Sequence, residues 1–111
     1  MTSKSSTITR KKADKEPLLP LITPGEFLAE EFLEPLRLSG NALALALRVP
    51  ANRIQGIING QRAITADTDL RLARYFGMSE GFFIGLQTDY ELMQRRREIG
   101  DKLKAIRPRA A

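Results

Sequence analysis

The sequence predicts an all-α fold of five helices, with a helical extension at the C-terminal end and a disordered tail at the N-terminal end. Apolar residues recur every three or four positions through most of residues 24–107, which is the spacing of amphipathic helices. No stretch alternates polar and apolar residues for long enough to form a strand. Residues that begin or end helices separate the apolar repeats. The 111 residues provide for one compact core.

The chain divides into three expected segments. Residues 1–16 are rich in Ser, Thr and Lys, with Ile8 as their one branched aliphatic side chain, so we predict a disordered basic tail. Pro17 and Pro20 favour an extended lead-in to a globular domain over residues 17–88. Residues 89–111 are predicted to form a C-terminal helix and a short tail.

The first helix is predicted over residues 24–34. Thr23 is its N-cap and Pro24 its first residue, both favoured at these positions. Leu28, Phe32 and Leu33 contribute to an apolar stripe along one side. The other side is acidic and carries Glu26, Glu30, Glu31 and Glu34. We expect this acidic side to face solvent and to point away from any polyanion.

Two short helices follow with a tight turn between them. Ser39 caps a helix that runs to about Leu47, and Pro50 begins another that ends at the pair Asn59-Gly60. Their apolar residues have the spacing of a helix-turn-helix, in which two short helices cross closely. These residues are Leu43, Ala44, Leu47, Val49, Ile54 and Ile57.

The remaining helices are predicted from caps and periodicity. Thr65 caps a helix over residues 66–76, which Gly77 ends. Ser79 is expected to cap a fifth, weak helix, because the glycines within it lower helix propensity. A separate helix from Asp89 to about Arg107 has a narrow apolar stripe, which makes three of its residues candidates for dimer contacts: Leu92, Ile99 and Leu103.

Composition excludes several classes of function. The chain has no cysteine and no histidine, which removes disulfides, thiolate nucleophiles, imidazole bases and nearly all common transition-metal sites. We therefore expect no cofactor and no metal. Adjacent carboxylates such as Glu30 and Glu31 diverge on a helix, so an enzyme is not expected. No apolar stretch is long enough for a membrane span or a signal peptide, which favours a cytoplasmic protein without membrane contact.

Charge points to a polyanionic partner. The net charge of +5 is uneven, because residues 36–78 hold six arginines and two aspartates. If the second helix of the helix-turn-helix enters the major groove of DNA, the residues opposite its isoleucine stripe face the bases. Asn and Gln pair with adenine, and Arg pairs with guanine or phosphate. The predicted base-reading residues are Asn52, Arg53, Gln55, Gly56 and Asn59, with Gly56 serving close approach.

A second set of residues lies at the ends of these helices, where side chains and backbone amides can bind phosphates. These residues position a protein on DNA without reading its sequence. The set comprises Ser39, Gly40, Asn41, Gln61 and Arg62.

The chain resembles the HigA-type antitoxins of the lambda-repressor-like helix-turn-helix class, the XRE family. Three stretches carry the resemblance: PGEFLAEEFLEPLRLS at 24–39, NALALALRVPANRIQGIINGQRAITADTDLRLARYFG at 41–77 and FFIGLQTDYEL at 82–92. The segment NGQRAITADT within them is far narrower than a general helix-turn-helix pattern. The resemblance covers most of the predicted globular domain.

The resemblance implies a function that composition does not reveal. Such antitoxins bind and silence a neighbouring HigB-like toxin, an mRNA-cleaving enzyme of the RelE-like fold. As homodimers they also repress the operon that encodes both proteins, with half-sites about 34 to 36 Å apart on double-stranded operator DNA. The acidic side of the first helix (Glu26, Glu30, Glu31 and Glu34) is a candidate toxin-binding surface, because it could cover a basic RNA-binding surface.

Several positions depart from the family's usual residues. Gly40 stands where a polar residue commonly contacts phosphate, and Arg48 stands where glycine usually adopts a left-handed turn. Asp69 replaces alanine on an apolar stripe, and Gly81 and Gly85 replace better helix formers. Together these departures predict a looser, weaker DNA binder that keeps the same fold.

Two other functions fit the same residues. A stand-alone transcriptional regulator would bind DNA without a toxin, and co-expression with the neighbouring open reading frame would distinguish it. A protein-interaction module would have lost DNA binding, as Gly40 and Arg48 could suggest. Absent or sequence-independent binding to its own promoter would favour that module.

Overall fold

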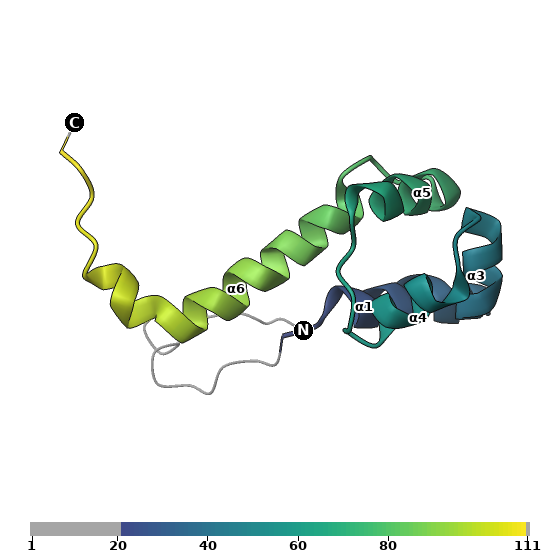
Figure 1. Ribbon diagram of the computed structural model, residues 1–111, viewed down its shortest axis with the longest axis horizontal. Coiled ribbons are helices and arrows are strands. Elements are labelled where there is room, and N and C mark those ends of the chain that lie inside the picture. Colours follow the sequence, from purple (N-terminus) through teal and green to yellow (C-terminus); the bar gives the residue numbers. More distant parts are fainter. Residues whose placement is uncertain (1–20, 111) are drawn as a thin grey trace, which may run out of the picture.

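The computed structural model describes residues 21–110, and every element of secondary structure in this range is a helix (Figure 1). The first helical rod consists of α1 (Pro24–Phe27), η2 (Leu28–Leu33) and α2 (Glu34–Leu36) in direct succession. It is followed by α3 (Gly40–Leu47), α4 (Ala51–Ile58), α5 (Ala66–Phe76) and α6 (Phe82–Lys104). The predicted all-α fold is confirmed. The predicted tail at residues 1–16 lies outside the described residues.

The first rod extends two residues beyond the predicted end at Glu34, and its middle is a π-helix. Proline inside an α-helix clashes with the carbonyl four residues earlier. Here the wider turn comes just before Pro35, and the amide of Glu34 donates to the carbonyl of Ala29, five residues back. The wider turn also brings Leu28 and Leu33, five residues apart, into the core together.

A cap fixes the start of this rod as the sequence predicted. The Thr23 hydroxyl accepts from the Glu26 amide at 3.0 Å, and the Glu26 carboxylate accepts from the Thr23 amide at 2.9 Å. These reciprocal bonds form a capping box. Glu26 is therefore engaged in stabilising the helix end as well as contributing to the acidic side.

One core joins all the helices. The first rod and each of the helices α3 to α6 contribute a side chain that is at most 1% exposed: Leu28, Leu43, Ile54, Leu72 and Phe83. Burial of a side chain of this size stabilises the fold by about 1.5 to 3 kcal/mol. Phenylalanines from the first rod, α5 and α6 pack around this core, with ring centroids between 4.8 and 6.5 Å apart.

Gly25 explains how the first rod approaches α4. A Cβ atom at this position would lie 2.0 Å from the carbonyl oxygen of Ile57, so only glycine allows this contact. The rod consequently packs directly against the C-terminal end of α4. The apolar pattern of the sequence did not indicate this contact, because glycine adds nothing to an apolar stripe.

The predicted fifth helix and C-terminal helix are one helix, α6, which begins at Phe82 and continues to Lys104. The expected cap at Ser79 is wrong. Gly81 is the N-cap residue, with a left-handed φ of 93°, and it has no side chain to cap the helix. The cap comes instead from Asp69, whose carboxylate accepts from the amides of Gly81, Phe83 and Ile84 at 2.7, 2.8 and 2.9 Å.

Asp69 departs from the family's usual alanine, but it strengthens the fold where α5 meets α6. It is 2% exposed and satisfies three amides at the start of α6. A buried carboxylate is stable when it receives charge-assisted hydrogen bonds of this kind. Asp69 links α5 to α6 and compensates for the glycine at the N-cap.

The second half of α6 projects away from the globular part of the molecule (Figure 1). Its apolar side chains are at least 43% exposed at Leu92, Met93, Leu103 and Ile106. The backbone departs from helical geometry at Ile99, with φ of −118° and ψ of 16°. Within residues 21–110, no helix is long and apolar enough to cross a membrane, and no group of acidic side chains is placed to hold a metal ion.

Candidate DNA interface

The candidate site is built on the pair α3 and α4, joined by Arg48, Val49 and Pro50. Arg48 has a left-handed φ of 62°, as the family's usual glycine at this position implied. Its amide donates to the carbonyl of Leu45 at 3.1 Å, and the Val49 amide donates to that of Ala44 at 3.0 Å. These bonds satisfy carbonyls at the end of α3 and reverse the chain. Pro50 is the N-cap of α4, and the helix begins one residue later than predicted.

The two sides of α4 differ in polarity. Ile54 and Ile57 are buried against α3 and the first rod, whereas Asn52, Gln55 and Asn59 are exposed. This arrangement matches a recognition helix, in which one side packs on the protein and the other carries amide side chains that can pair with base edges. The exposed amides of α4 thus form the centre of the candidate interface.

Two glycines let side chains pack tightly around α4. A Cβ atom at Gly56 would lie 3.1 Å from Cβ of Arg62, so the close approach at this position is to a side chain of the same molecule. A Cβ atom at Gly40 would lie 2.6 Å from Nε2 of Gln55. Gly40 is buried, and Gln55 lies across it at the start of α3. These glycines shape the surface around the exposed amides.

An ion-pair network connects α4 to α5 and α3. Nη1 of Arg53 and Nε of Arg71 lie 2.7 and 2.9 Å from the same oxygen, Oδ2 of Asp67. Nη1 of Arg71 also donates to the carbonyl of Leu47, the last residue of α3, at 2.7 Å. The hydrogen bonds from Arg53 and then Arg71 lower the pKa of Asp67 below its ordinary value. Asp67 is thus charged at neutral pH.

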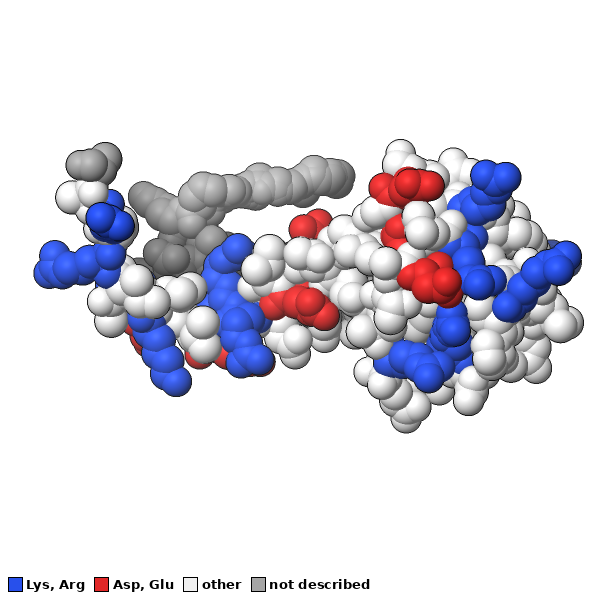
Figure 2. Space-filling view, turned by 45° about the horizontal axis from the view of Figure 1, so that its top comes forward, with Lys and Arg blue, Asp and Glu red and all other residues white. Residues whose placement is uncertain are grey.

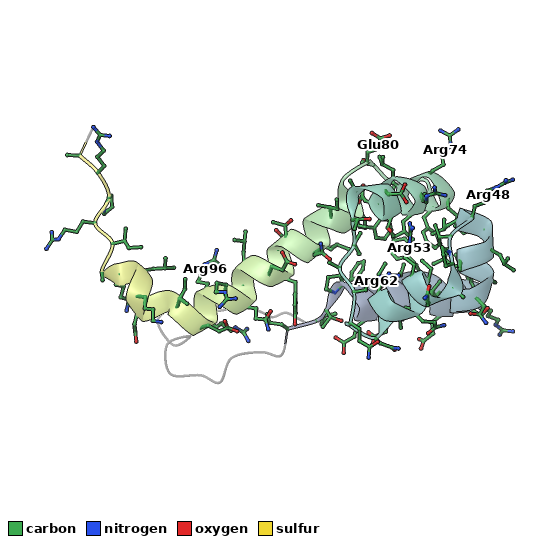
Figure 3. The ribbon with its side chains drawn as sticks, viewed as in Figure 1. Arg48, Arg53, Arg62, Arg74, Glu80 and Arg96 are labelled. Atoms are coloured by element: carbon green, nitrogen blue, oxygen red, sulfur yellow. The ribbon has the colours of Figure 1, made fainter. Side chains whose placement is uncertain are left out.

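The basic side chains form a band across the part of the molecule made by α3, α4 and α5 (Figure 2). Arg53 and Arg74 lie on α4 and α5, and Arg48 and Arg62 lie on the connections that follow α3 and α4 (Figure 3). A hollow of about 330 Å³ lies within this part of the molecule, and its lining includes Arg53, Arg62, Arg71, Asp67 and two threonines. Positive charge beside exposed amides is the arrangement expected of a DNA-binding surface.

Comparison with known proteins identifies the fold's relatives. Residues 30–83 match the helix-turn-helix family model. The chain is 53% identical to virulence-associated protein I of Dichelobacter nodosus over 74 residues, which are 67% of this chain and 68% of that protein. It is 32% identical to antitoxin HigA-1 of Vibrio cholerae over 87 residues, 78% and 82% of the two chains. An Escherichia coli relative, 35% identical over 81% of each chain, is described only as an uncharacterized transcriptional regulator.

A solved structure agrees with these relatives. The Pseudomonas aeruginosa antitoxin HigA, solved with the higBA promoter, superposes with a TM-score of 0.75 at 39% identity, covering 82% of this chain and all of that one. The chain belongs to the HigA-type helix-turn-helix family. It is therefore a DNA-binding protein of the antitoxin and regulator class and not an enzyme.

The HigA-type fold places the predicted residues in three groups. The base-reading candidates lie along α4 and, with Asn59, at its C-cap, but Arg53 is turned toward Asp67 in an ion pair. Of the phosphate-binding candidates, Ser39 caps α3 by accepting from the Ala42 amide at 3.0 Å, Asn41 is exposed, and Gln61 and Arg62 follow α4. The four glutamates of the first rod are all exposed.

Sequence reasoning missed the partners of these residues. The pairing of Asp67 with Arg71 could have been found from their spacing of four on a helix. Its pairing with Arg53 joins residues fourteen apart across two helices and leaves no local signal. Contacts of this second kind determine how the arginines of the interface are held.

Proposed function

We propose that this protein is an antitoxin that neutralises a RelE-like mRNA-cleaving toxin and, as a homodimer in the cytoplasm, binds operator DNA to repress its own operon. The observation that carries the DNA half is the row of exposed amides on α4 beside the arginine band. The HigA relatives support the antitoxin half.

DNA recognition divides between two groups of side chains. Asn52, Gln55 and Asn59 read base edges from α4, while Arg62 and the amides near Asn41 bind phosphates at either end of the helix-turn-helix. A homodimer would place two such units on successive half-sites of the operator. The exposed apolar residues of α6, including Leu92 and Leu103, are candidates for the dimer contact.

The toxin-binding surface is assigned to the exposed glutamates of the first rod. Glu30 and Glu34 offer carboxylates that are not used in the capping box, and an RNA-cleaving toxin needs a basic surface for its substrate. Reversing both charges, as Glu30→Lys with Glu34→Lys, should weaken toxin binding at least tenfold. The single reversal Glu30→Lys is compared with Glu80→Lys, which makes the same change in net charge at the turn between α5 and α6 (Figure 3).

The first experiment is co-expression with the neighbouring open reading frame, purification through a tag on this chain and mass measurement by light scattering. A stable complex with a second small protein, whose expression alone stops growth, would support the antitoxin function. A homodimer that purifies alone, beside a neighbour that is harmless, would favour a stand-alone regulator. The Escherichia coli relative named as a transcriptional regulator makes this the second candidate.

The DNA half is tested separately by selecting duplexes from a randomised library with the purified chain. Recovery of one enriched sequence, also present upstream of its own coding sequence, would support autorepression. Recovery of unrelated sequences would contradict specific binding and favour the protein-interaction module.

A further inference from the structure

Asp67 is an exposed acidic residue within the arginine band of the DNA interface. Residues 36–78 contain two acids, and the other, Asp69, is buried beneath α6. The side chain of Asp67 is 56% exposed and lines the hollow beside Arg53, Arg62 and Arg71. A carboxylate at this place repels the phosphates that the surrounding arginines attract. Its presence therefore calls for a physical explanation.

The geometry shows what this carboxylate holds. Its Oδ2 atom accepts from Arg53 on α4 at 2.7 Å and from Arg71 on α5 at 2.9 Å. Arg71 is fixed in turn by the carbonyl of Leu47 at the end of α3. The guanidinium of Arg53 is thus tied to a rigid point on α5, and one of its donors is occupied. Arg62, which lines the same hollow, has no acidic partner within 4.0 Å among residues 21–110.

We infer that Asp67 is a specificity-determining residue of the DNA interface, which restrains Arg53 and Arg71 from binding phosphates of any sequence. The inference rests on the proposed DNA-binding function. Non-specific affinity comes from arginines and lysines that neutralise phosphates. Asp67 lowers that affinity for every duplex, whereas an oriented Arg53 contributes fully only where the DNA presents a matching group. Asp67 therefore widens the gap between operator and other DNA.

The test is the variant Asp67→Asn, measured by fluorescence anisotropy against two duplexes. One is the sequence that the wild-type chain selects from a randomised library, and the other is a scrambled duplex of the same length and composition. Arg71 keeps its hydrogen bond to the carbonyl of Leu47 in this variant, so the arginine that becomes free is Arg53. Release of one arginine to a phosphate adds about 0.9 to the salt slope, which is worth about eightfold in affinity at 0.1 M salt. We expect the scrambled duplex to bind about eightfold tighter and the selected duplex to change less than threefold.

Two controls isolate the restraint. Glu80→Gln makes the same change in net charge, but Glu80 points away from α4 (Figure 3) and should leave the affinity ratio of the two duplexes unchanged. In an Arg53→Ala background, Asp67→Asn should raise non-specific affinity less than it does in the wild type, because one of the two restrained arginines is gone. Circular dichroism checks that each variant folds.

If Asp67 only stabilised the fold, Asp67→Asn would have a different effect on DNA binding. Partial unfolding reduces binding to both duplexes by the same factor and leaves the ratio and the salt slope unchanged. That result, or an unchanged affinity for scrambled DNA, would overturn the inference while leaving the proposed DNA binding intact. If the wild-type chain enriches no sequence at all, the proposed function fails and the inference falls with it.

Discussion

Replacement of Asp69 should destabilise the protein far more than replacement of any exposed acid. Its carboxylate is the acceptor for three backbone amides at the start of α6, two of which belong to the buried Phe83 and the partly buried Ile84. Among residues 21–110, no other side chain caps this helix. In Asp69→Ala all three amides lose their acceptor, and each buried amide left unpaired costs about 1 to 3 kcal/mol. Because the Gly81 amide can turn to water, we expect a loss of about 4 kcal/mol.

Asp69→Asn separates geometry from charge. The amide oxygen can still accept from Phe83 and Ile84, but the new NH2 group would face the Gly81 amide, where the carboxylate oxygen now lies 2.7 Å away. Two donors then meet, and the bonds that remain are no longer charge-assisted. We expect a loss of about 2 kcal/mol, roughly half that of the alanine variant.

Urea unfolding followed by far-ultraviolet circular dichroism measures these losses. All variants are compared at one protein concentration, because the stability of a homodimer depends on concentration. The control is Asp101→Ala, an exposed acid near the other end of α6, which should change the free energy of unfolding by less than about 0.5 kcal/mol. Amide hydrogen exchange at Phe83 and Ile84 localises the effect. A loss below 1 kcal/mol in Asp69→Ala, with exchange at both amides unchanged, would refute the capping role.

Three further predictions concern the interface and its supports. Gln55→Ala should weaken binding to the selected duplex by about 1 to 3 kcal/mol and leave binding to scrambled DNA unaffected. Arg62→Ala should weaken binding to both duplexes and reduce the salt slope by about 1. Equal effects of the two variants on scrambled DNA would contradict the assignment of Gln55 to base reading and Arg62 to phosphate binding. Gly25→Ala should lower the melting temperature because its Cβ would meet the carbonyl of Ile57, whereas Gly85→Ala, with open space around it, should stabilise α6 by about 0.5 to 1 kcal/mol. The pKa of Asp67 lies below its ordinary value, so the stability that its ion pairs contribute is present at a pH above the ordinary pKa and is lost as pH falls through the lowered pKa. Carboxyl NMR titration should show the pKa of Asp67 rising in Arg53→Ala, and an unchanged pKa would contradict the pairing.

Caps and apolar spacing predicted most of the fold because both act over a few residues. Thr23, Ser39 and Thr65 accept from amides three residues later, as their positions in the sequence indicated. The left-handed turn at Arg48 was implied by the resemblance to the HigA-type family, which usually has glycine there. The end of the first rod was predicted too early because Pro35 is accommodated by a π turn that apolar spacing does not reveal.

The parts that could not be predicted depend on contacts between distant residues. Ser79 looked like the cap of α6 because it stands just before an apolar segment, but the cap is supplied from α5, twelve or more residues earlier. Gly25 looked neutral until α4 was placed against it. The same holds for Arg53. Its position on α4 puts it at the edge of the predicted reading surface, but its partner on α5 decides where the guanidinium lies.

The two aspartates of α5 have separate roles, one in DNA recognition and the other in the stability of the fold. Asp67 and Asp69 are two residues apart, and an α-helix turns by about 200° over two residues, so their side chains leave the helix on opposite sides. One meets the arginine of α4 and the other meets the amides of α6. Loss of Asp67 should therefore alter how DNA is discriminated while the fold persists. Loss of Asp69 should unfold the junction with α6 and reduce binding to all DNA by one factor, because the molecules that remain folded keep the same reading surface.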